Sequence, residues 1–400
     1  MASLIYLDNS ATTRQYDEVT ELMYQTAKNT YGNPSSLHSL GFEANNMLTD
    51  ARRDIEALMN PGGEVIFTSG GTESDNMALV STARKLKRRG RRIITTAVEH
   101  PAVLETCRRL SEDGFEVIYA GVDEKGLVNT EEIRQALSDD TIMVSVMTVN
   151  NESGTVQPVN EISRMIREYN KSHGSGIVFH TDAVQAFGKL RMSGINADLI
   201  SVSGHKFHGP RGAGFLYMRK DLKLPAFITG GGQENHYRSS TENLPGIAGM
   251  ALAAKISYED IDTKMQEMSE VNDYLYKGLT AELRDIVLNG AENLGWSVDN
   301  EVMRGARCPA VLNITFKGTR GEVLLHTLEQ DGIFVSTGSA CASHKTGDSH
   351  VLSAMGLDHK AIEGAIRFSF SEFNTIEEMD VVIDRVKAAV NRFRRLGSFR

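Results

Sequence analysis

The sequence has few cysteines and no long uninterrupted run of apolar residues. Its three cysteines lie far apart in the 400-residue chain. An odd number at distant positions argues against a framework of disulfides and is typical of a protein kept in a reducing compartment. The first residues, MASLIYLDNS, have no basic region before an apolar one. We therefore expect a cytoplasmic protein with no signal peptide and no membrane-spanning helix, which would need about 20 consecutive apolar residues.

The sequence also lacks an excess of positive charge. Lys and Arg number 43 against 52 Asp and Glu, which gives a net charge of −9. This balance argues against binding nucleic acid through the overall electrostatic field. The one basic run, KLKRRGRR from Lys85 to Arg92, is typical of the exposed last turn of a helix. Docking of an acidic partner or of RNA is the alternative for this run.

An alternation of short apolar runs and amphipathic stretches extends from about residue 60 to residue 220. It predicts an α/β fold with a mostly parallel sheet wrapped by helices. The seven expected strands are EVIFTS, RIITTAV, EVIYAG, IMVSVMTV, GIVFHTD, DLISVSG and GAGFLYM. Several are followed by polar residues or glycine. In open α/β sheets ligands bind at the carboxyl ends of the strands, so these polar ends should converge on one site.

The length of the chain predicts a second lobe, and the pattern changes after Gly249. Apolar residues at helical spacing from Ile261 to Leu279 predict a long helix that leaves the first lobe. VLNITF and IRFSF predict half-buried strands, and in IRFSF the side chain of Arg367 faces away from the core. Thr375 and Glu378 predict a capping box at the start of a closing helix.

Two residues at neighbouring strand ends carry complementary chemistry. Lys206 directly follows DLISVSG, and Asp182 ends the preceding strand GIVFHTD. Burial lowers the pKa of a lysine toward the neutral amine that a Schiff base requires. Such a pair suits pyridoxal phosphate, whose aldehyde needs a lysine and whose pyridine nitrogen needs an acid. Taken singly, a surface cation and a helix N-cap are the alternatives.

Other polar groups would complete such a site. In TSGGTESDN, a glycine turn at Gly71 opens a helix whose free amides suit a phosphate, and Thr72 adds a hydroxyl. Ser203 and His205 lie beside the lysine and would supply further donors. His100 ends IITTAVEH, where an imidazole would stack on a planar ring or transfer protons.

Cys341 lies in VSTGSACASHKTG, a segment of small and polar residues with two glycines and no apolar anchor. This composition predicts a mobile loop whose thiol is available for chemistry. A fraction of such a thiol is thiolate at neutral pH, and nearby His344 and Lys345 would raise that fraction. We expect Cys107 and Cys308 to be structural.

Together these motifs resemble the cysteine desulfurases of the NifS/IscS type, which are class-V aminotransferases of the pyridoxal-phosphate fold type I. The resemblance covers nearly the whole chain through YLDNSATT, YGNPSSLH, FTSGGTESDN, VEHPAV, VNNESG, HTDAVQAFGK, SVSGHKFHGPRGAG, STGSACAS and IRFSF. It implies a large domain with a mostly parallel seven-stranded sheet, residues 15–260, that binds pyridoxal 5'-phosphate. Residues 1–14 and 261–400 would form a smaller α+β domain with the cysteine loop at about 335–348.

The resemblance also implies roles around the cofactor ring. Lys206 would hold the aldehyde, Asp182 would pair with the pyridine nitrogen, and His100 would stack on the ring and take part in catalysis. Gln185 would bond the phenolic oxygen, with Asn151 nearby.

Further implied roles concern the phosphate and the substrate. The phosphate would be held by Gly71, Thr72, Ser203 and His205, joined by Thr241 from the second subunit of a homodimer. Arg367 would clamp the carboxylate of the substrate, near Asn151.

The chain departs from the family pattern in a few places. RSSTEN stands where RSGTEN is usual, so Ser240 replaces a glycine, and a positive φ there would change the reach of Thr241. QENHY, just before it, lacks the usual arginine and glycine. Ser10 replaces the asparagine of LDNNATT, a change that we expect to be tolerated.

The implied reaction converts L-cysteine to L-alanine and leaves a persulfide on Cys341 for a protein acceptor. The acceptor would serve iron–sulfur cluster assembly or the thiolation of tRNA or cofactors, with no direct contact to nucleic acid. A selenocysteine lyase or an aminotransferase of the same fold is the nearest alternative. A metal site at His205, His208, Cys341 and His344 is another. A non-catalytic sulfur carrier is the third, and it would not need Lys206 or Arg367.

Overall fold

The apolar runs form strands and the amphipathic stretches form helices in a computed structural model, which describes residues 4–297, 305–337 and 347–397. The strands are β1 (Ile5–Tyr6), β2 (Gly63–Thr68), β3 (Arg92–Thr96), β4 (Glu116–Ala120), β5 (Thr141–Ser145), β6 (Val178–Asp182), β7 (Leu199–Ser203), β8 (Gly214–Arg219), β9 (Ile286–Leu288), β10 (Val311–Phe316), β11 (Ile333–Phe334) and β12 (Ala365–Ser369). The helices are α1 (Asp17–Asn29), α2 (Ser39–Glu56), α3 (Gly71–Leu86), α4 (Pro101–Glu112), α5 (Thr130–Ala136), α6 (Val159–His173), α7 (Leu244–Tyr258), α8 (Ile261–Glu282), α9 (Gly321–Gln330), α10 (His350–Ala354), α11 (His359–Glu363) and α12 (Ile376–Arg395).

Seven strands form one sheet in the order β2-β8-β7-β6-β5-β3-β4. β8 is antiparallel to both β2 and β7, and the other neighbouring strands are parallel. The mostly parallel seven-stranded sheet predicted from the sequence is therefore confirmed.

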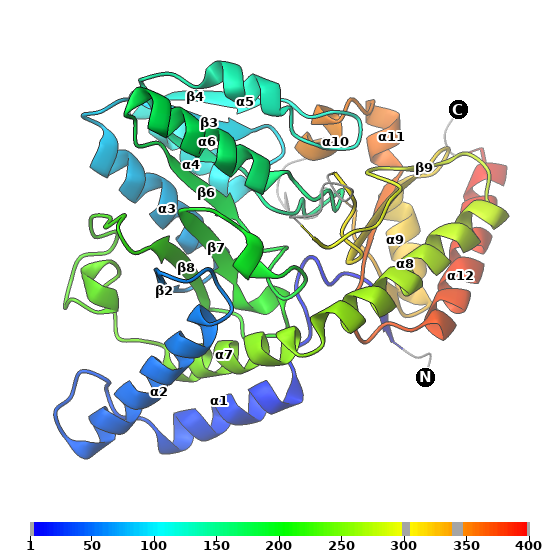
Figure 1. The fold of residues 1–400 in the computed structure, drawn as a ribbon. Helices are drawn as coiled ribbons and strands as arrows, with labels where there is room; N and C mark the ends of the chain where they lie inside the picture. Colours follow the sequence, from blue (N-terminus) through cyan, green and yellow to red (C-terminus); the bar gives the residue numbers. More distant parts are fainter. Residues whose placement is uncertain (1–3, 298–304, 338–346, 398–400) are drawn as a thin grey trace.

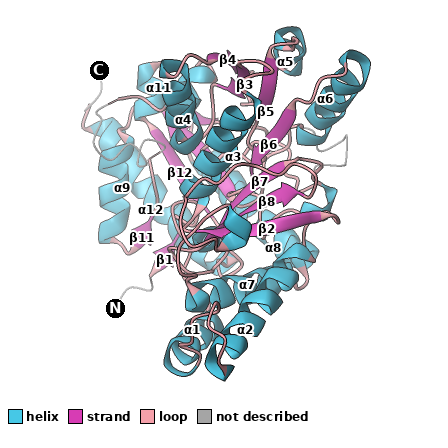
Figure 2. Ribbon diagram, turned by 90° about the vertical axis from the view of Figure 1, so that its left-hand side faces the viewer, coloured by secondary structure: helices cyan, strands magenta, loops and turns pink. Residues whose placement is uncertain are grey.

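Successive residues of one strand pack into two separate apolar clusters, so helices cover both faces of the sheet. In β2, Val65 and Phe67 join the larger cluster, while Ile66 joins a cluster that α3 and α4 complete. Figure 2 shows α3 and α4 on one side of the sheet and α6 on the other. Because helices cover both faces, a ligand can reach the sheet only at its edge, where the polar residues lie at the carboxyl ends of the parallel strands.

The second lobe contains an antiparallel sheet, β12-β10-β9, and a short parallel pair, β1-β11. The predicted long helix is α8, which extends from the first lobe to the second (Figure 1). The predicted capping box is confirmed at the start of α12. Thr375 Oγ1 accepts a hydrogen bond from Glu378 N at 3.4 Å, and Glu378 Oε2 accepts one from Thr375 N at 3.2 Å.

The prediction that β10 and β12 are half-buried is wrong, because every residue of both strands is buried. Asn313, on the polar side of β10, is 0% exposed. Its amide donates to the carbonyl oxygen of Glu152 and accepts from Asn289 Nδ2. The polar side of this sheet therefore packs on the first lobe instead of facing solvent.

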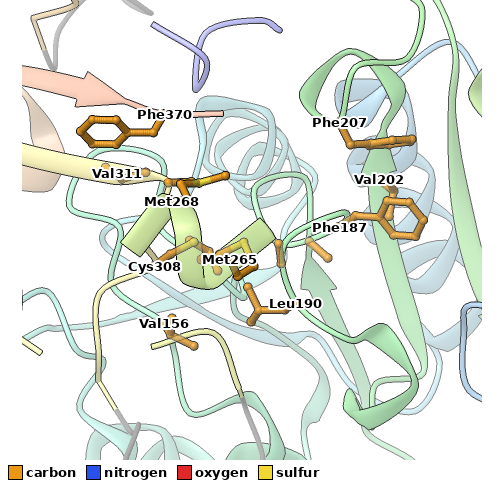
Figure 3. Close-up of a cluster of buried hydrophobic side chains, with 14 of the residues drawn as sticks. Val156, Phe187, Leu190, Val202, Phe207, Met265, Met268, Cys308, Val311 and Phe370 are labelled. Carbon is orange, nitrogen blue, oxygen red and sulfur yellow. The ribbon is translucent and has the colours of Figure 1, made fainter. Parts of the chain in front are cut away.

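The two lobes share one apolar core. Phe187 and Val202 of the large sheet region belong to the same cluster as Met265 of α8 and Phe370 after β12, as Figure 3 shows. Cys308 is buried in this cluster and Cys107 in the other, which agrees with a structural role for both. The proposed domain boundaries remain a prediction.

Within the described ranges, no helix combines the length and apolar character needed to cross a membrane.

Candidate active site

Asp182 and Lys206 lie at neighbouring strand ends. β6 and β7 are parallel, with Asp182 opposite Ser201, and Lys206 follows β7 in a short helical turn. Burial raises the pKa of Asp182 to about 6, against the hydrogen bond from Val184 N and the positive charge of Lys206, which both lower it. A protonated ring nitrogen beside this carboxyl would further favour its ionised form.

The N-terminal segment forms one wall of the site. Lys206 Nζ donates to the carbonyl oxygens of Ser10 and Ala11. Gln185 Nε2 donates to the Ser10 oxygen at 3.0 Å, and His205 Nδ1 lies 3.2 Å from Thr12 Oγ1. Because Ser10 contacts Lys206 and Gln185 through its backbone, its replacement of the usual asparagine leaves these contacts intact.

His100 caps helix α4 and lies beside the same site. Its Nδ1 accepts a hydrogen bond from Ala102 N at 3.1 Å. Burial, with smaller contributions from the charges of Lys206 and His350, lowers the pKa of His100 to about 4. The ring is therefore neutral at pH 7, and because Nδ1 is an acceptor its proton is on Nε2.

The turn between β2 and α3 forms a cup for an anion. Gly70 has a φ of +152°, which favours glycine, and a Cβ atom on Gly71 would lie 2.7 Å from a Val184 side-chain carbon. Because Gly70 and Gly71 have no side chains, the chain can pass close to Val184 and the backbone amides of the first turn of α3 are left uncovered for a ligand. Ser203 is buried on one side of this cup, and Thr72 is exposed at its rim.

Glu73 connects the cup to Arg238, and the sequence alone did not indicate this role. Its Oε2 accepts a hydrogen bond from Ser69 N at 2.8 Å. Both of its oxygens accept from Arg238, at 2.7 and 3.2 Å. The signal for Glu73 was only its position in TESDN, where a first-turn acid suits a helix N-terminus.

The buried side chain of Arg367, in β12, is held in place by two hydrogen-bond partners. It is 1% exposed, its Nη1 donates to the Asn151 carbonyl oxygen at 3.0 Å, and its Nη2 donates to Asp8 Oδ1 at 2.9 Å. Among the described residues, its buried Nε has no hydrogen-bond partner. The guanidinium thus has a fixed orientation, and its Nε–H is left available to a ligand. Asp8 was not recognised from the sequence, because nothing in YLDNSATT indicates a partner in the last strand.

A buried polar network lies behind Asp182. His180 bonds Ser145 at 2.8 Å and Ser201 at 2.9 Å, and its ring lies 3.6 Å from Asp75 Oδ1. Burial raises the pKa of Asp75 well above its usual range and lowers that of His180 to about 3. His180 is therefore neutral near pH 7, and burial disfavours the charged form of Asp75. The network provides a buried polar support for Asp182, a role that no motif had indicated.

The residues present fit pyridoxal phosphate. In the part of the chain that the structure describes, Gln185 Oε1 is buried and has no hydrogen-bond partner. This oxygen would accept a hydrogen bond from the protonated ring hydroxyl, while Asp182 and Lys206 offer an acid and an amine. The cup at Gly70 and Gly71 offers amides to the phosphate.

Other predicted residues lie outside this cluster. Thr241 is exposed. The φ of Ser240 is not positive, so serine in place of the usual glycine causes no backbone strain there.

Cys341, His344 and Lys345 lie outside the described residues. Within the described ranges no group of three or more His, Cys, Asp or Glu is placed to hold a metal ion, although half of the alternative metal site lies outside those ranges.

Known proteins are similar to this chain over nearly its whole length. A model of the family described as aminotransferase class-V matches residues 5–382. A cysteine desulfurase IscS of Dictyoglomus turgidum is 39% identical over 99% of this chain and 97% of its own length. The solved structure of a NifS-like protein has a TM-score of 0.87 at 37% identity, covering 98% of this chain and 100% of that one. SspA in complex with cysteine has a TM-score of 0.77 at 30% identity, covering 93% of this chain and 100% of that one.

These matches extend over the whole length on which the site depends, from the N-terminal wall to β12. The chain belongs to the class-V aminotransferase family, whose cofactor is pyridoxal phosphate.

Proposed function

We propose that the protein is a pyridoxal-phosphate-dependent cysteine desulfurase, which converts L-cysteine to L-alanine and keeps the sulfur as a persulfide on Cys341. One observation carries the proposal. Lys206 binds the carbonyls of Ser10 and Ala11, while Arg367 binds Asp8, so one short segment brings the amine and the guanidinium to the same site. An α-amino acid matches this arrangement, because its carboxylate would bind the guanidinium while its amino group takes the place of the Lys206 amine at the cofactor aldehyde. The names of the relatives above support cysteine as that amino acid.

When bound, the cofactor stores the electron pair released from the substrate Cα. Arg367 binds the substrate carboxylate through its unused Nε and is kept in orientation by Asn151 and Asp8. Lys206 Nζ takes the Cα proton as general base. Asp182 would hold a proton on the ring nitrogen of the cofactor, whose positive charge would favour the ionised carboxylate. His100, neutral at pH 7, would cover the ring and offer Nε2–H as a donor.

The sulfur step belongs to Cys341. As thiolate, it attacks the substrate sulfur, so that a sulfur–sulfur bond replaces the carbon–sulfur bond and alanine is released after protonation. His344 and Lys345 would favour the thiolate form. The persulfide then passes to a protein acceptor that serves iron–sulfur cluster assembly or thiolation.

A homodimer is part of the proposal. Exposed apolar side chains are concentrated between α1 and the start of α2, at Tyr24, Tyr31, Leu37, Leu40 and Phe42. A second copy would cover them. Thr241, exposed in its own subunit, would reach the phosphate of the partner. We also propose that the protein acts in the cytoplasm and that residues 15–260 form its cofactor domain.

The test is the Cys341→Ala variant, loaded with cofactor and supplied with L-cysteine. We expect it to lose sulfide and persulfide formation while keeping the cofactor's absorption, with Cys107→Ala as the control that keeps both. Release of sulfide at the parent rate by Cys341→Ala would show that the persulfide mechanism is wrong. Unchanged release of selenium from selenocysteine by the same variant would instead favour a selenocysteine lyase.

A second experiment addresses the cofactor. The absorption band of the bound cofactor should be lost in Lys206→Ala. A colourless parent protein that cannot be reconstituted with pyridoxal phosphate would overturn the enzyme proposal. Incubating the persulfide-loaded protein with a panel of acceptors identifies where the sulfur goes.

A further inference from the structure

The segment that leads to Thr241, Gly232–Asn243, has an unusual backbone, and we call it the arm. Three consecutive non-glycine residues, Glu234, Asn235 and His236, have φ values of 49°, 52° and 68°. A left-handed conformation costs roughly 1–2 kcal/mol for each such residue. Specific contacts must therefore hold the arm in this shape.

The first of these contacts is made by Glu234, which is 6% exposed. Arg52 of α2 donates to its two carboxylate oxygens at 2.7 and 2.8 Å. Phe67 N, in β2, donates to the same carboxylate at 2.8 Å. The start of the arm is thus fixed to the strand that leads into the phosphate cup.

The second contact is made by Arg238, three residues before Thr241. Its guanidinium binds both oxygens of Glu73, and one of these oxygens also accepts the Ser69 backbone N–H. The two side chains are largely buried, at 19% and 12% exposed, so solvent screens their attraction only in part. Ser69 is in the cup, so this carboxylate links the cup of one subunit to the arm of the same subunit.

We infer that Glu73 and Arg238 couple the two cofactor sites of the dimer. The inference rests on the proposed function, in which Thr241 at the tip of each arm contacts the phosphate in the partner. A phosphate bound in one cup fixes the turn from Ser69 to Glu73 and, through Arg238, the arm that serves the other cup. Linkage is reciprocal, so binding of the cofactor at either site favours binding at the other.

Both residues are positioning residues, because neither is placed to touch the cofactor. The coupling has a physical path of three groups, the Ser69 amide, the Glu73 carboxylate and the Arg238 guanidinium, which leads to the arm. Couplings of this kind typically change affinity by about 5- to 150-fold. Cooperative loading of the cofactor is therefore the property that these residues control, separately from the chemistry at Lys206.

The test titrates the cofactor-free dimer with pyridoxal phosphate and follows binding by calorimetry and by quenching of protein fluorescence. We expect a Hill coefficient clearly above 1 for the parent and about 1 for Arg238→Met. Arg238→Lys, which keeps the charge, should restore part of the cooperativity. Glu105→Gln removes an exposed ion pair with Arg108 on α4 and should bind like the parent.

Two results would overturn the inference while leaving the proposed function intact: non-cooperative binding by the parent dimer, or unchanged cooperativity in Arg238→Met. Should Arg238→Met fail to fold, Glu73→Gln, which keeps the shape of the side chain, gives the same comparison. A parent that is monomeric or binds no cofactor would overturn both the inference and the proposed function.

Discussion

Glu99 is a buried acid that makes the stability of the protein depend on pH. It is 0% exposed, its Oε1 accepts hydrogen bonds from Thr96 and Met147, and its Oε2 has no partner among the described residues. Burial raises the pKa of Glu99 to about 8, although the two hydrogen bonds act in the opposite direction. Because this pKa is above the unfolded value of 4.5, the stabilisation is complete below pH 4.5 and is lost as the pH rises through about 8.

Glu99→Gln should remove this dependence. Glutamine keeps the accepting oxygen and cannot ionise, so the variant should gain stability relative to the parent steadily between pH 4.5 and about 8. Thermal melts at the two ends of this window measure the difference. Equal shifts in melting temperature at both ends would show that Glu99 does not titrate in the folded protein.

Arg367 should determine the affinity for the substrate. The three donors of a lysine all lie on one nitrogen, so they cannot reproduce the planar guanidinium that bonds Asn151 and Asp8 and also faces a carboxylate. Arg367→Lys should therefore raise KM for L-cysteine by about tenfold or more, with a smaller effect on kcat. Steady-state alanine formation measures both constants. Arg307→Lys is the matched control, since Arg307 is also 1% exposed but binds Asn272 and Ala291. It should lower the melting temperature and leave KM unchanged.

At this scale the sequence predicted the residues that follow strands and missed those that pair across the chain. Asp182 ends the recognisable strand β6 and Lys206 follows β7, and the pairing of these two strands brings the residues together. Asp8 and Glu73 have partners far away in the sequence, Arg367 and Arg238. Such pairs depend on tertiary packing, which no local pattern encodes.

The helix α12 gives a prediction at the scale of one element. Thr375→Ala removes one half of the capping box and should lower the free energy of unfolding by about 1 kcal/mol. Urea denaturation measures this loss. Thr280 is exposed in the last turn of α8, and its hydroxyl bonds only carbonyl oxygens of its own helix. Thr280→Ala should be neutral or slightly stabilising, because alanine is the better helix former. Equal losses in both variants would mean that the cap contributes nothing of its own.

Helices and strands with a clear apolar periodicity were predicted well, whereas the burial of their polar side chains was not. The strand β10 was recognised from its alternating pattern, yet Asn313 and Thr315 are fully buried. Polar partners from Asn289 and Glu152 make that burial possible, and they come from distant segments. The left-handed turn of the arm was not predicted either, because its residues are held there by Arg52 and Phe67 rather than by their own preferences.

The whole molecule should associate through the apolar surface between α1 and α2. Leu37 is 103% exposed, so Leu37→Glu should not disturb the fold of one subunit but should place a charge in the dimer contact. We expect a shift from dimer to monomer in sedimentation velocity, together with weaker retention of the cofactor. Val381→Glu, at a 43% exposed position on α12, is the control that should stay dimeric. A dimer in both variants would place the contact elsewhere.

The N-terminal wall of the site also sets the order in which the site is made during translation. Asp8 and Ser10 precede Lys206 in the chain, whereas their partners Arg367 and Ser369 follow it by more than a hundred residues. A nascent chain that ends just after Lys206 therefore still lacks Arg367, the residue that we propose for the substrate carboxylate. In the proposed mechanism, substrate binding becomes possible only after β12 has been synthesised and has joined the N-terminal wall.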